Sequence, residues 1–124
     1  MAILRRGLGF VIASYTGDAA SVAVDLDLGF VPAKAEAIDV TSGTTEWYWN
    51  MGMSGFTTGG SNGVFGVFAT NSAGGAQFNT LTTGATGIQA LVGSGTTGIG
   101  LTIGTNALIN APSHGYIVTA WEAH

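Results

Sequence analysis

The chain contains no cysteine and very little charge. Without thiols there is no disulfide and no thiolate chemistry. Only 8% of its 124 residues are Asp, Glu, Lys or Arg, whereas an ordinary soluble domain has roughly 25%. Apolar residues still make up 46% of the chain. So few charged residues cannot cover the surface of the folded chain. That surface must therefore consist of Gly, Ser, Thr and Asn or be covered by other chains. The composition therefore favours an assembly.

Basic residues are scarcer than acidic ones, with three Lys and Arg against seven Asp and Glu, and the formal net charge is -4. Nucleic-acid binding depends on neutralising phosphates, so we expect no nucleic-acid partner. An anionic membrane surface is an equally poor partner, and no run of about 18 apolar residues predicts a spanning helix. The apolar run "LGFVIA" after Arg6 is shorter than the roughly 7 to 15 residues of a secretory signal. We therefore expect a chain that is made in the cytoplasm and is not exported.

Helical periodicity is almost absent as well. The stretch "PAKAEA", residues 32–37, is the only one with several good helix formers, and it is short. The chain also has 21 glycines, and each glycine inside a helix costs about 1 kcal/mol relative to alanine. The sequence therefore argues against a helical fold.

Alternation of apolar and polar residues is common instead. In "SVAVDLDL", residues 21–28, valines and leucines share one face while Asp25 and Asp27 share the other. The stretch "GYIVTAWEA", residues 115–123, is apolar on both faces, which is typical of a central strand or of one covered by a neighbouring chain. Glycine-rich turns separate these from further expected strands at 8–15, 34–40, 45–51, 63–69, 76–82, 87–92 and 98–103.

This pattern predicts one all-β domain over residues 1–124. We expect an antiparallel β-sandwich or a jelly-roll-like barrel with about eight or nine short strands. Residues 1–7, ahead of the first expected strand, are interpreted as an N-terminal arm.

The stretch "EWYWN", residues 46–50, concentrates large aromatic side chains. On a strand, Trp47 and Trp49 point to one face, with Met51 continuing their row, and Tyr48 points to the other. Large rings dominate small cores, so we expect both tryptophans and Met51 inside. Tyr48 is expected to be more exposed and to contact a partner.

The residues that could carry chemistry form no recognisable site. His114 lies in the loop "PSHGY" and is interpreted as a turn residue, since no His, Asp and Glu occur together at metal-ligand spacing. Asp25 and Asp27 could hold carboxylates about 7 Å apart, as in a glycosidase pair, but a solvated outer face explains them more simply. The stretch "GSGTTGIG" lacks the lysine of a phosphate loop. We therefore expect no catalytic residue, no cofactor and no metal.

The order of two segments resembles a known group of proteins. The first is "LGFVPAKAEAIDVTSGTTEWYWNMGM", with a "GF-x-P" entry, a "T-S-G" turn and an aromatic strand that ends in "GM". The second is "GIGLTIGTNALIN", followed by the closing aromatic strand "GYIVTAWEA". Together, over roughly 28–53 and 97–122, they resemble small β-rich structural proteins of tailed-phage virions, of the capsid decoration (cement) type or tail-associated. The resemblance implies a virion part without catalytic residues.

The resulting functional hypothesis is a non-enzymatic capsid decoration protein that is made in the host cytoplasm and binds the outside of the head lattice. The resemblance implies a homotrimer, because phage decorations often occupy three-fold positions, with the major capsid protein or another virion protein as partner. The alternative is a tail-associated or fibre-associated carbohydrate-binding module. The expected interface residues are two arginines on the arm and aromatic or apolar side chains interpreted as outward-facing: Arg5, Arg6, Tyr48, Phe65, Phe68, Tyr116 and Val118.

Overall fold

The computed structural model describes residues 1–18, 22–53, 63–72, 75–93 and 98–123. These ranges contain ten β-strands and no α-helix, so the all-β prediction is confirmed. The strands are β1 (Ala2–Gly7), β2 (Phe10–Thr16), β3 (Val24–Asp27), β4 (Pro32–Asp39), β5 (Thr45–Asn50), β6 (Val67–Ser72), β7 (Gly75–Thr80), β8 (Ile88–Val92), β9 (Ile99–Ile103) and β10 (Gly115–Glu122).

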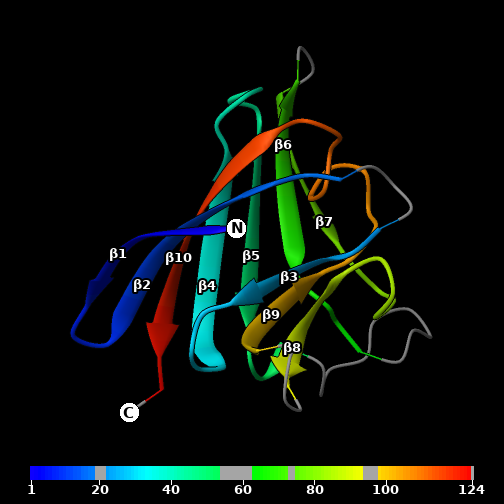
Figure 1. Ribbon diagram of the computed structural model, residues 1–124. Helices are drawn as coiled ribbons and strands as arrows, with labels where there is room; N and C mark the ends of the chain where they lie inside the picture. The colour runs from blue at the N-terminus through cyan, green and yellow to red at the C-terminus, as the bar shows by residue number, and fades with distance from the viewer. Residues whose placement is uncertain (19–21, 54–62, 73–74, 94–97, 124) are drawn as a thin grey trace.

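The strands form two antiparallel sheets that face each other as a β-sandwich (Figure 1). The large sheet has seven strands in the order β1-β2-β10-β4-β5-β6-β7, and the small sheet has three in the order β3-β9-β8. We call the face of the large sheet that packs against the small sheet its inner face, and the opposite one its outer face. The closing strand β10 lies between β2 and β4, which makes it a central strand, one of the two possibilities that the sequence left open.

The core lies between the two sheets and contains both tryptophans of β5. Trp47 is fully buried and Trp49 is 7% exposed, which confirms the prediction for these two residues. The neighbouring strand β4 makes room for them, because Ala37 is opposite Trp47 and Ala35 is opposite Trp49. Met51 was expected in the same row, but β5 ends at Asn50 and the Met51 side chain is 50% exposed.

The polar atoms of three core aromatics, Trp47, Tyr15 and Tyr116, are used in hydrogen bonds. Trp47 Nε1 donates to the Tyr15 hydroxyl over 2.8 Å, and that hydroxyl donates to the carbonyl of Ile109 over 2.8 Å. The Tyr15 ring stacks on Tyr116, with ring centroids 4.6 Å apart, and the Tyr116 hydroxyl donates to the carbonyl of Leu108. Burial raises the pKa of Tyr15 well above its ordinary value and also raises the pKa of Tyr116. Both phenols are therefore neutral structural groups.

The N-terminal segment differs from the expectation. Residues 2–7 are not an arm but the edge strand β1, which pairs with β2 along Phe10–Ser14. All six residues of β1 are exposed, because the small sheet does not reach this edge (Figure 1). A strand that buries neither face does not need alternating apolar and polar residues. The sequence prediction therefore missed β1.

Candidate functional site: the outer face of the large sheet

The outer face of the large sheet is the broadest surface that no other layer of the described chain covers. Residues directly opposite each other on antiparallel strands share a face, so the strand register defines rows across it. One row contains Arg5, Ile12, Thr119, Glu36, Tyr48, Val67 and Thr80. The adjacent row contains Ala2, Ser14, Ile117, Ile38, Glu46, Ala69 and Phe78.

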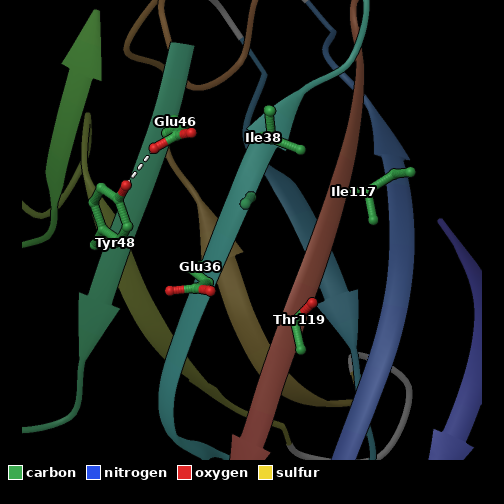
Figure 2. A pocket seen from close by; sticks show the side chains of 7 residues that line it. Glu36, Ile38, Glu46, Tyr48, Ile117 and Thr119 are labelled. Carbon is green, nitrogen blue, oxygen red and sulfur yellow. Dashed lines mark hydrogen bonds between the residues drawn. The ribbon is translucent and has the colours of Figure 1, made fainter. Parts of the chain in front are cut away.

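The middle of these rows forms a hollow of about 330 Å³. Figure 2 shows its side chains pointing out of the sheet from β4, β5 and β10. They are Glu36, Ile38, Glu46, Tyr48, Ile117 and Thr119, with Ala37 also in the lining. Ile38 is 39% and Ile117 37% exposed. The hollow therefore combines open apolar side chains on one side with two carboxylates on the other.

Tyr48 and Glu46 form the polar edge of the hollow. The Tyr48 hydroxyl donates a hydrogen bond to the Glu46 carboxylate, drawn as a dashed line in Figure 2. This bond, partial burial and the negative charges of Glu46 and Glu36 raise the pKa of Tyr48 to about 12. Tyr48 is thus neutral at ordinary pH, and its hydroxyl already donates its one hydrogen bond to Glu46. As predicted, it is more exposed than Trp47 and Trp49.

The arginines of β1 point to opposite faces of the sheet. The register of β1 and β2 shifts between Ile3 and Arg5, so that Arg5 is opposite Ile12 on the outer face and Arg6 is opposite Val11 on the inner face. Arg6 Nη1 donates to the carbonyl of Leu28 over 2.9 Å, which holds the edge of the large sheet to the end of β3. Within the described residues Arg5 has no ion pair and no side-chain hydrogen bond.

Lys34 is the third basic residue of the chain and lies on the outer face, opposite Trp121. Its Nζ is 4.6 Å from the centroid of the Trp121 ring, a distance typical of a cation–π contact. Lys34 therefore contacts Trp121 on the neighbouring strand β10. The residues that line the hollow include two carboxylates and no basic side chain.

Three of the expected interface residues are in the core instead. Tyr116 is 1%, Val118 0% and Phe68 8% exposed, so the expectation that they face outward is wrong. Strand β10 is apolar on both faces, and the burial of Tyr116 is favoured by hydrogen-bond partners in the preceding loop: the Leu108 carbonyl and the Ala111 N–H. The residues of β10 that lie on the outer face are Ile117, Thr119 and Trp121. Phe65 is partly buried and packs against the core.

Sequence reasoning missed the polar cluster around Asp39. This residue is 2% exposed; its Oδ1 accepts the N–H groups of Thr41 and Ser42, each over 3.0 Å, and its Oδ2 lies 2.7 Å from His114 Nδ1. Burial acts to raise the pKa of Asp39, but these hydrogen bonds outweigh it and hold the pKa below its ordinary value. His114 thus fastens the loop before β10 to the end of β4. Its only sequence signal was its place in a turn.

Asp25 and Asp27 lie on the exposed side of the small sheet and serve local structure. Asp25 accepts a hydrogen bond from Thr102 Oγ1 over 2.7 Å, and Asp27 accepts one from the Ile99 N–H over 3.2 Å. Each carboxylate therefore braces β3 against β9, the strand with which it pairs.

In the part of the chain that the structure describes, no three His, Asp or Glu side chains come together in a way that could hold a metal ion. The same residues include no helix with the length and apolar character needed to cross a membrane. Comparison of the chain with family models, curated proteins and solved structures finds no match. The resemblance to phage structural proteins therefore stays a prediction.

Proposed function

We propose that the chain is a non-catalytic structural protein that assembles with other copies and with a larger protein lattice through the outer face of its large sheet. The observation that carries this proposal is the row of open apolar side chains on that face: Ile117 and Ile38 in the middle and Phe78, 70% exposed, towards the β7 edge. Glu46 and Ala69 lie between Ile38 and Phe78 on this row, so only Ile117 and Ile38 are adjacent. Exposed apolar side chains that lie together are typical of interaction sites.

The lattice that we propose is a virion, with the chain as a capsid decoration protein on the outside of the head and the major capsid protein as its partner. Two features support this. The order of the segments 28–53 and 97–122 resembles phage structural proteins, and the chain is too poor in charge to solubilise a large free surface. The resemblance also implies synthesis in the host cytoplasm and a three-fold arrangement of copies.

The test is to purify the particles that the encoding genome produces and to search for the chain in them. We expect it to sediment with intact, DNA-filled particles and to be visible as added density on the outer surface of the head by electron microscopy. Intact particles that lack the chain would overturn the virion proposal.

A second candidate function is carbohydrate binding, and the hollow of Figure 2 favours it specifically. The Tyr48 ring offers an apolar surface to a sugar, while Glu36 and Glu46 offer acceptors for sugar hydroxyl groups. A glycan array tests this. Binding that is lost in Tyr48→Ala and kept in Asp25→Asn, on the other sheet, would favour the carbohydrate module over the decoration protein.

A further inference from the structure

We infer that the outer face forms a two-fold symmetric dimer with a second copy of this chain, in which Arg5 of each copy pairs with Glu36 of the other. The inference rests on the proposed assembly of copies through this face, and it replaces the three-fold arrangement that the resemblance implies with a two-fold one. It is carried by the positions of these two opposite charges on one row of the sheet.

Arg5 and Glu36 cannot pair within one chain. They lie on the same row, on β1 and β4, with Ile12 and Thr119 between them. Three strand spacings separate them, which is about 14 Å, far beyond the distance of an ion pair. Both side chains are exposed, and each is therefore available to a partner.

A two-fold axis that runs parallel to the strands, between β2 and β10, brings Arg5 of one copy opposite Glu36 of the other. It exchanges β1 with β4 and β2 with β10 and keeps each row aligned with itself. Arg5 of one copy then faces Glu36 of the other, and the reverse pair forms on the opposite side of the axis. A closed dimer uses one self-complementary patch in this way.

The residues between the two ion pairs also match. The axis places Ile12 against Thr119 of the second copy, Ile117 against Ser14, and Ile38 against Ala2. In the second and third of these pairs a large apolar side chain meets a small one, which allows two sheet faces to approach closely. The interface thus has an apolar centre and charged edges, the usual anatomy of a specific contact.

The register shift in β1 is needed for this pairing. Without it, Leu4 would be opposite Ile12, and Arg5 would point to the inner face, because a one-residue slip moves every side chain to the other side. Bulges often re-aim a side chain at a functional position. Here the irregularity directs Arg5 outward while Arg6 still reaches Leu28 on the inner side.

The footprint sets the expected strength. Four strands of up to eight residues cover roughly 500 Å² per partner, which just meets the total of about 1,000 Å² for a specific interface. We therefore expect a dimer of micromolar affinity. Strand β5, with Tyr48 and Glu46, falls outside the footprint and stays open to a lattice or a glycan.

The experiment is sedimentation velocity of the purified chain over a micromolar concentration range. We expect a monomer–dimer equilibrium for the wild type. Arg5→Glu alone and Glu36→Arg alone place two like-charge pairs in each dimer, and each should weaken dimerisation on the order of 100-fold. The matched control is Asp25→Arg, which makes the same charge change as Glu36→Arg on the other sheet and should dimerise like the wild type. Unchanged thermal melting of each variant shows that it folds.

Mixing the two single variants gives the decisive result. A heterodimer of Arg5→Glu with Glu36→Arg contains one native and one reversed ion pair, so the mixture should dimerise although each variant alone does not. A wild type that is monomeric or trimeric, or a mixture that stays monomeric, overturns the two-fold pairing. The proposed function is judged separately, by whether the chain is found on particles, so the two can fail independently.

Discussion

The two faces of the large sheet are built from the same strands, yet they differ in packing and in how their polar groups are paired. On the inner face, rings and methyl groups pack densely, and among the described residues no buried side-chain polar atom lacks a hydrogen-bond partner. On the outer face, isoleucines lie open beside carboxylates, and Arg5 has no partner among the described side chains. The difference shows that the chain completes its inner face by itself, and it supports the proposal that the outer face binds a partner.

The largest expected effect is on the inner face, at Trp47. Trp47→Ala removes a fully buried ring and the donor to Tyr15 and should lower the free energy of unfolding by about 3–5 kcal/mol. Tyr48→Ala, one residue further on the outer face, should change it by about 0.5 kcal/mol. Urea denaturation at low protein concentration measures both. Equal losses would remove the distinction between the two faces.

The next comparison uses two neighbours on β10. Val118→Asn places an amide in the core in place of a fully buried side chain and should cost about 3 kcal/mol. Ile117→Asn makes the same kind of change at a 37% exposed position and should cost about 0.5 kcal/mol, while it should weaken the proposed dimer. A destabilisation by Ile117→Asn as large as that of Val118→Asn would show that the outer face is covered within the chain.

This strand also shows how far the sequence could predict the structure. Alternation located the strands and placed Trp47 and Trp49 inside, since every second residue of a half-buried strand is apolar and buried. It could not choose the inner face of β10, because both faces are apolar and the choice depends on partners for Tyr116 from a separate loop. It missed β1, which buries neither face.

The candidate site was less accessible to sequence reasoning than the fold. Arg5, Glu36 and Tyr48 share a row only because of the strand order and a register shift, which are long-range properties. Arg5 and Tyr48 were named as contact residues from their type and local position. Glu36 gave no local signal, since an alternating strand explains a single exposed glutamate completely.

A third prediction concerns acid stability and the buried carboxylate Asp39. Because its pKa is lowered in the folded chain, Asp39 stabilises the native state above its unfolded pKa of about 3.9. That contribution is lost as the pH falls through the lowered folded value. Asp39→Asn should cost about 1–3 kcal/mol at pH 7 and should make the loss of stability below about pH 4 less steep.

The control for Asp39 is Asp25→Asn, at an exposed position on the small sheet, which should change the free energy of unfolding by about 0.5 kcal/mol. Urea denaturation across the acid range compares the two variants with the wild type. An Asp39→Asn variant that loses stability in acid as steeply as the wild type would show that other carboxylates dominate the acid response.

The smallest effect is expected on the outer face, in the titration of Tyr48. Its pKa of about 12 is raised first by the hydrogen bond to Glu46 and further by partial burial and by the charges of Glu46 and Glu36. Glu46→Gln replaces the charged acceptor with a neutral one, so the pKa should fall towards 10, the ordinary value for tyrosine. Glu36→Gln removes only a more distant charge and should lower it less. NMR titration of the Tyr48 ring carbons distinguishes the two variants.

Since both glutamates are exposed, neither substitution should change the free energy of unfolding by more than about 0.5 kcal/mol. A pKa that Glu46→Gln leaves unmoved would mean that the polar edge of the hollow is not set by this hydrogen bond, and Tyr48 would then be free to donate to a partner.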